Sequence, residues 1–156
     1  MSEPLLVTAF DTLRILVVDD DRALADLVEA FLKAASVGSV VKVSGALAAL
    51  NLLADQHRKF DCIVCDQNMG LMTGLALLKD IRAGRHVHIP RTQNFIMLTS
   101  HGEEAVVRAA IELDVNGYLR KPVTKEALVK ALHRAFNRKP VLKSPEAYGA
   151  VALPAA

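Results

Sequence analysis

The chain has 156 residues, of which 52% are hydrophobic and 23% charged, a composition typical of a globular domain with a sizeable core. Its formal net charge of +2 is too small to argue for nucleic-acid binding by electrostatic attraction. No apolar run approaches the roughly 20 residues that a membrane span needs, and the N-terminus lacks the pattern of a secretion signal. We therefore expect a cytoplasmic protein that neither inserts into membranes nor binds nucleic acid.

The first third of the chain is predicted to form two strand–helix units after a lead-in, residues 1–12, that has no strong pattern. The apolar run 14–18 indicates a strand covered on both faces, and it ends in three consecutive acids, Asp19, Asp20 and Asp21. Helical spacing predicts a helix over about 21–35, which one of these acids can cap. A second strand follows at 39–43. Ser44 is a plausible cap for the next helix, whose apolar residues are Leu47, Leu50 and Ala54.

The most informative stretch is residues 61–70, near the middle of the chain. Four apolar residues run directly into Asp66 and then into a polar turn that contains Gly70. This pattern predicts a buried parallel strand over about 61–65 that presents Asp66 to solvent at its C-terminal end. Thr73 can cap the helix that follows.

The two cysteines, Cys62 and Cys65, have the spacing of some redox motifs. Three steps along a strand cover about 10 Å and place their side chains on opposite faces, too far apart for a disulfide. We therefore interpret both as buried thiols that behave as small hydrophobic residues.

A polar, basic loop at 84–93 precedes the fourth predicted strand, 95–98, which ends in Thr99. A helix is expected to begin at Glu103, with an apolar face formed by Val107, Ala110 and Ile111.

The last strand–helix unit begins with a short fifth strand around 118–119, which is followed by Lys121. The final helix starts near Thr124. Residues 139–156 hold three prolines and many alanines without a usable period, so we predict a mostly disordered tail there.

Five alternating strand–helix units over residues 13–138 predict one α/β domain. Right-handed crossovers place helices on both faces of a five-stranded, doubly wound parallel sheet, which is a (βα)5 arrangement.

The carboxyl ends of parallel strands share one edge of a sheet, so the polar residues at those ends can converge there. They are Asp19, Asp20, Asp66, Thr99 and Lys121. Three clustered acids repel one another unless a cation neutralises them, and Mg²⁺ prefers such oxygen ligands. A metal, an ammonium and a hydroxyl also suit a phosphoryl group, and a carboxylate can be its acceptor. The pattern thus predicts Asp66 as a phosphoacceptor beside a magnesium site.

Four motifs in this order and spacing resemble the receiver domain of two-component response regulators, with its CheY-like (flavodoxin-like) fold. The resemblance covers about 13–137, and the chain would be a stand-alone receiver. The motifs are Val17-Val18-Asp19-Asp20-Asp21, Val64-Cys65-Asp66-Gln67-Asn68-Met69, Met97-Leu98-Thr99-Ser100 and Leu119-Arg120-Lys121-Pro122.

The resemblance implies roles for individual positions. Asp66 would be phosphorylated, Asp20 would bind Mg²⁺ directly and Asp19 largely through water, and the backbone carbonyl of Asn68 would be a further ligand. The side chain of Asn68, with that of His101, would tune the lifetime of the phosphoryl group. An exposed loop histidine without a role is an equally open interpretation of His101.

The resemblance also implies how the state of Asp66 is read. Thr99 and Lys121 would bind the phosphoryl oxygens, and Tyr118 would be an aromatic switch that responds to Thr99. The Lys121-Pro122 bond is commonly cis in the family. One position departs from the family pattern, because Gly70 stands where proline is usual, which makes the loop after Asp66 looser.

The implied function is a signalling switch rather than an enzyme, with self-catalysed phosphotransfer and slow autodephosphorylation. A histidine kinase or a histidine phosphotransfer protein would supply the phosphoryl group, and the output would be binding to a downstream protein or a further relay step. Two alternatives remain: a phosphorylation-independent scaffold with a receiver fold, and a Mg²⁺-dependent phosphatase that uses the first acidic cluster as its nucleophile.

Overall fold

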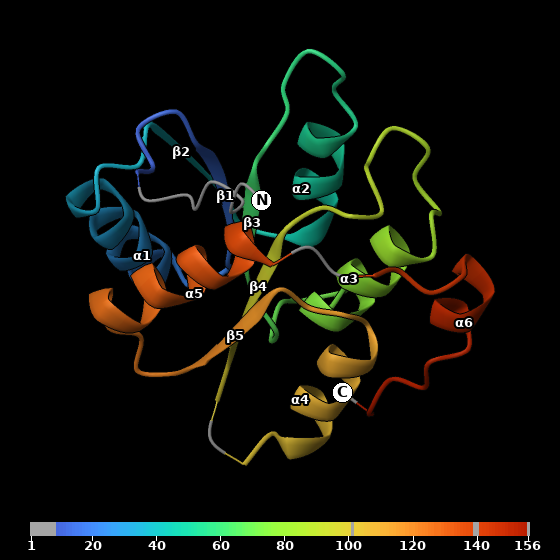
Figure 1. The fold of residues 1–156 in the computed structure, drawn as a ribbon. Helices are drawn as coiled ribbons and strands as arrows, with labels where there is room; N and C mark the ends of the chain where they lie inside the picture. The colour runs from blue at the N-terminus through green and yellow to red at the C-terminus, as the bar shows by residue number, and fades with distance from the viewer. Residues whose placement is uncertain (1–8, 101, 139–140, 156) are drawn as a thin grey trace, which may run out of the picture.

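Five parallel strands form one sheet in the order β2-β1-β3-β4-β5 (Figure 1). The structure is a computed structural model that describes residues 9–100, 102–138 and 141–155. The strands are β1 (Arg14–Val18), β2 (Ser39–Val43), β3 (Cys62–Asp66), β4 (Phe95–Thr99) and β5 (Gly117–Arg120). The helices are α1 (Arg22–Ala34), α2 (Ala46–Leu53), α3 (Gly74–Arg82), α4 (Glu104–Glu112), α5 (Lys125–Asn137) and α6 (Pro145–Gly149).

Helices cover both faces of the sheet, which confirms the predicted doubly wound α/β fold. Figure 1 shows α1 and α5 on one face and α2, α3 and α4 on the other. Two separate apolar clusters fill the two interfaces, and β3 contributes to both. Cys62 belongs to one cluster and Cys65 to the other, so the two thiols lie on opposite faces as predicted. Burial raises the pKa of both thiols, which keeps them protonated and unreactive.

Side-chain caps fix the starts of α1, α3 and α5; the sequence predicted the first two caps and the position at which the third helix begins. Asp21 accepts a hydrogen bond from the amide of Leu24 at α1, and Thr73 and Thr124 cap α3 and α5 in the same way. Each of these helices begins directly after the loop at the carboxyl end of a strand, so its cap helps to set the geometry of that loop.

The prediction for α2 was wrong in two respects. Gly45 rather than Ser44 is the N-cap, and it makes no side-chain hydrogen bond. The buried residues are Ala46, Ala49 and Leu53, whereas Leu47 is 67% exposed. Seven of the eight residues of α2 are apolar, so the sequence pattern does not distinguish its faces.

The segment 141–155 also differs from the prediction of a disordered tail. It contains α6, which packs beside α3 (Figure 1). Ser144 caps α6 and Pro145 occupies its first turn, while the side chain of Tyr148 is fully buried. A five-residue helix is too short to give a periodic signal, and one anchoring aromatic residue was therefore overlooked. Residues 139–140 and 156 of the predicted tail, and residues 1–8 of the lead-in, lie outside the described residues.

A buried arginine joins α3 to the loops before β4 and β5. It lies at the amino-terminal edge of the sheet, opposite the edge that carries the acids. Arg82, at the end of α3, is fully buried, and its guanidinium donates five hydrogen bonds. The acceptors are the backbone oxygens of Arg91, Gln93, Leu113 and Asp114 and the side-chain oxygen of Asn116. Burial lowers the pKa of Arg82 to about 10, which leaves it charged at neutral pH. The loops before β4 and β5 are thereby held to α3.

We expect Arg82→Met to lower the free energy of unfolding by about 3–5 kcal/mol, because five acceptors would lose their donor. Arg85→Ala is the matched control, since the half-exposed side chain of Arg85 makes an ion pair with Asp80, and its cost should stay below about 1 kcal/mol. Urea denaturation measures both, and equal losses in the two variants would contradict this role of Arg82.

None of the helices in the described residues combines the length and the apolar character needed to cross a membrane.

Candidate functional site

Three carboxylates meet where β1 and β3 end. Asp19 and Asp20 directly follow β1, and Asp66 is the last residue of the neighbouring strand β3. One carboxylate oxygen from each lies within 4.8 Å of the others, as the sheet edge predicted. Asp19 and Asp66 are buried, whereas Asp20 is exposed, so the cluster opens to solvent on the Asp20 side.

Asp66 is less accessible than the sequence suggested, with only 3% of its surface exposed. The loop after β3 folds back over the strand end, and the amide of Gly74 donates to the backbone oxygen of Gln67. A Cβ atom at Gly74 would lie 2.7 Å from the backbone oxygen of Asp66, so only glycine permits this approach. The side chain of Gln67 accepts a hydrogen bond from the amide of Leu75, which ties the loop to the start of α3.

Lys121 reaches the same cluster from the end of β5. Its Nζ lies 2.8 Å from Oδ1 of Asp66. The amide of Lys121 donates to the backbone oxygen of Thr99, which places the ends of β4 and β5 side by side. The Lys121-Pro122 bond is cis, as the resemblance implied. Asp66 therefore contacts one positive charge, that of Lys121. The cluster of three acids carries more negative charge than this single ammonium can balance.

Burial and charge both act on the protonation of these groups. Burial raises the pKa of Asp19 to about 6. The charge of Asp66 also raises this pKa, whereas the hydrogen bond from the Asp21 amide lowers it. Burial also raises the pKa of Asp66, although the ammonium of Lys121 opposes that increase. For Lys121, burial lowers the pKa, but the charges of Asp66 and Asp19 outweigh this effect and raise it overall.

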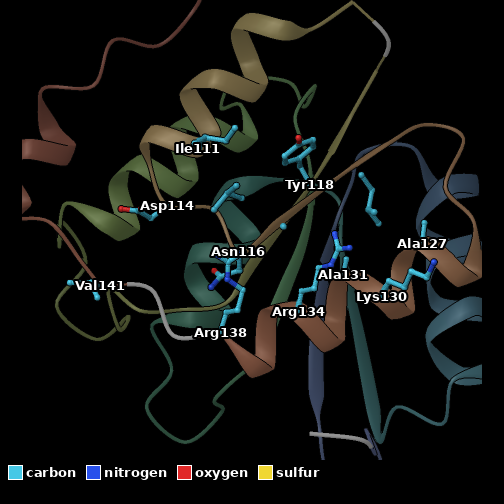
Figure 2. A pocket seen from close by; sticks show the side chains of 13 residues that line it. Ile111, Asp114, Asn116, Tyr118, Ala127, Lys130, Ala131, Arg134, Arg138 and Val141 are labelled. Atoms are coloured by element: carbon cyan, nitrogen blue, oxygen red, sulfur yellow. The ribbon is translucent and has the colours of Figure 1, made fainter. Parts of the chain in front are cut away.

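Thr99 lies at the same edge, at the end of β4, and is fully buried. Its hydroxyl donates to the backbone oxygen of Leu119 at 3.4 Å, and among the described residues it makes no hydrogen bond to Asp66. Tyr118, on β5, is 41% exposed and lines a groove of about 770 Å³ between α4 and α5. Figure 2 shows Ile111 of α4 and Arg134 of α5 on opposite sides of β5 in this groove.

The chain matches the response regulator receiver domain family over residues 15–133. It belongs to that family.

Relatives and solved structures agree with this assignment. Chemotaxis protein CheY-3 of Vibrio cholerae is 32% identical over 127 residues, which cover 81% of this chain and 93% of that protein. Chemotaxis protein CheY of Pseudomonas aeruginosa is 29% identical over 127 residues, with coverage of 81% and 98%. The crystal structure of a putative response regulator from Chloroflexus aurantiacus has a TM-score of 0.71 at 27% identity, and covers 81% of this chain and 99% of its own. The protein is therefore a receiver of the two-component signalling type, a class of switches that are in general not enzymes.

One contact of this receiver was not foreseen from the sequence. The side-chain amide of Asn68 donates to Glu103, and the other carboxylate oxygen of Glu103 accepts from the amide of Ser100. Glu103 thus bridges the loops that follow β3 and β4. The sequence marked Glu103 only as an acid at a helix start, which gives no hint of this bridge. His101 lies outside the described residues, so its predicted role stays a prediction.

The unusual Gly70 does not use the conformational freedom of glycine, because its φ lies outside the positive region where Gly84 and Gly102 are found. A Cβ atom at Gly70 would meet nothing within 4 Å. The loop of this receiver therefore tolerates a side chain at that position on steric grounds.

We expect the acidic cluster to cost stability in the metal-free receiver. The folded-state pKa of Asp19, about 6, exceeds its ordinary value of 3.8, so the folded state binds this proton more tightly. The contribution of Asp19 therefore destabilises the fold increasingly as pH rises from about 4 to 6, and fully above that. Asp19→Asn should raise the free energy of unfolding by about 1–2 kcal/mol at pH 7.5 with a chelator, and by much less at pH 4.5.

Urea denaturation at the two pH values measures this effect. Asp26→Asn is the control, because Asp26 is exposed and its hydrogen bond with Lys42 lowers its pKa, so its replacement should not stabilise the protein at pH 7.5. A decrease in stability for Asp19→Asn at pH 7.5 would contradict the expected repulsion.

A second expectation concerns the two glycines of the loop. Gly74→Ala should lower the free energy of unfolding by about 1–3 kcal/mol, because its Cβ atom would force the backbone of Asp66 to move. Gly70→Ala, with open space around it, should change stability by less than about 0.5 kcal/mol. Thermal or urea denaturation distinguishes the two, and a harmless Gly74→Ala would show that the close approach is not required.

Proposed function

We propose that the protein is a phosphorylation-controlled switch of a two-component system, in which Asp66 accepts a phosphoryl group from a histidine kinase or a histidine phosphotransfer protein. The observation that carries the proposal is the convergence of Asp19, Asp20 and Asp66 within 4.8 Å, with the ammonium of Lys121 2.8 Å from Asp66. The partners would be proteins rather than nucleic acids or membranes, and the proposed location is the cytoplasm.

The donor set fits a hard divalent cation such as Mg²⁺. Oδ2 of Asp19 is buried and has no hydrogen-bond partner among the described residues, and the three acids carry more negative charge than Lys121 balances. Asp20, Asp19 and Asp66, with the backbone carbonyl of Asn68, would hold the ion. When bound, Mg²⁺ supplies charge neutralisation for the carboxylates and the phosphoryl oxygens.

The covalent step would take place on the carboxylate of Asp66. One of its oxygens attacks the phosphorus of a phosphohistidine, an O–P bond forms as the N–P bond breaks, and the departing imidazole takes up a proton. Lys121 moves its contact from the carboxylate to the new phosphoryl oxygens and so holds their charge. Hydrolysis of the acyl phosphate by water later restores Asp66, at a rate that Asn68 and His101 would modulate.

The switch step would begin at Thr99. Its hydroxyl would give up the long bond to Leu119 and donate to a phosphoryl oxygen instead. Tyr118, half-exposed on the adjacent strand, would then change its rotamer and alter the groove between α4 and α5, where a downstream protein or a relay partner binds. Such a step biases an equilibrium between two conformations and requires no new chemistry.

Incubation with acetyl phosphate and Mg²⁺, followed by intact-mass measurement, tests the proposal. The unmodified chain should gain one phosphoryl group, and both Asp66→Asn and addition of a chelator should prevent the gain. Asp55→Asn, a change at an exposed acid in the loop before β3, at the opposite end of that strand from Asp66, should leave it intact.

Two other results would replace the proposal with one of the alternatives. Absence of label under all conditions, also from a panel of histidine kinases, would favour a phosphorylation-independent scaffold. Steady turnover of a phosphomonoester that is lost in Asp19→Asn but kept in Asp66→Asn would favour a phosphatase.

A further inference from the structure

The segment 141–155, which we call the strap, crosses from the end of α5 to α3 and contacts α4 on the way (Figure 1). The ring of Tyr148, which belongs to the strap, is fully buried in the apolar cluster on the α3 and α4 side of the sheet. Leu142, Val151 and Leu153 pack against the same cluster. The strap is therefore attached along most of its length.

The strap binds the C-terminal end of α4. Nζ of Lys143 donates to the backbone oxygen of Glu112 at 2.8 Å, and the hydroxyl of Tyr148 donates to Oδ2 of Asp114 at 2.6 Å. Asp114 has a φ of 52°, so it ends α4 in a left-handed conformation that these bonds help to hold. The same hydroxyl accepts from the amide of Lys143, which closes a small ring of contacts around the helix end.

The strap also binds α3 and the loop before β4. Nζ of Lys79, on α3, donates to the backbone oxygen of Val151 at 2.8 Å. The guanidinium of Arg91 donates to the backbone oxygen of Lys143 and lies over the ring of Tyr148. Because the strap is fixed to α3 at one end and to α4 at the other, it cannot keep all its contacts if α4 moves relative to α3.

Helix α4 forms one wall of the groove of Tyr118, opposite α5. Ile111, in the last turn of α4, lines this groove together with Asp114 and with Val141 from the start of the strap (Figure 2). The strap thus contacts α4, which forms one wall of the groove. This is the groove that the proposed movement of Thr99 would alter. Contacts made in one conformation and lost in the other shift the equilibrium toward the first.

We propose that the strap is a built-in restraint on the switch, which holds α4 against α3 in the unphosphorylated arrangement and makes activation harder. The proposal rests on the proposed phosphorylation of Asp66. Tyr148 acts as a positioning residue, through Asp114, on the helix that borders the groove. Loosening the strap should therefore lower the stability of the fold and at the same time ease the activated conformation.

Titration with beryllium fluoride at saturating Mg²⁺ tests the restraint, because this anion imitates a phosphoryl group and needs no kinase. The sequence contains two tyrosines, so selective tyrosine labelling gives NMR signals from Tyr118 at the groove and Tyr148 in the strap. Tyr148→Phe removes the hydroxyl but keeps the ring, and Lys143→Met removes the bond to Glu112. Glu146→Gln, an exposed change in the same segment, is the matched control.

We expect the Tyr118 signal to shift at about threefold to tenfold lower anion concentration in Tyr148→Phe and Lys143→Met, while both variants unfold at lower temperature. Glu146→Gln should titrate like the unmodified chain. A purely structural role for the strap would lower stability without easing the titration, so unchanged or higher midpoints in both variants would overturn the restraint. If the unmodified chain itself does not bind the anion with Mg²⁺, the proposed function fails, and the restraint fails with it.

Discussion

Mutual repulsion among three carboxylates at one edge of the sheet is the constraint on which the rest of this receiver depends. β1 and β3 are neighbours, so their ends bring Asp19 and Asp20 against Asp66, and the loop held by Gly74 covers Asp66. A single ammonium, from Lys121, offsets part of this charge. Such a cluster favours a divalent cation, and it carries unfavourable free energy without one.

A continuous set of contacts connects this edge to the surface. Lys121 is hydrogen-bonded through its amide to Thr99, and the hydroxyl of Thr99 donates to the backbone of Leu119 on β5. The residue before Leu119 is Tyr118, which lines the groove beside α4. The far end of α4 is then bound by Arg82 and by the strap. These contacts link the acidic edge of the sheet to the exposed groove beside α4.

The sequence was sufficient for the fold and for most of the site because both depend on local patterns. Buried strands appear as apolar runs, and parallel pairing brings their polar ends together, which located Asp66 and Lys121 without coordinates. The omissions are contacts between segments far apart in the chain. Arg82 gives no sign that it is buried, and Glu103 gives no sign that it bridges two loops, because neither property has a period. The apolar face of α2 was misassigned for a related reason, since a helix that is apolar all round has no preferred direction in its sequence.

The attachment of the strap has a practical consequence for anyone who studies this receiver with reporters. Any polypeptide joined after residue 155 is connected, through only a few residues, to Val151 and Tyr148, and thus to α3 and α4. A fluorescent protein or an affinity tag joined after residue 155 would lie close to these two helices. Labels introduced before β1, whose neighbours are β2 and β3, avoid this direct connection to α3 and α4.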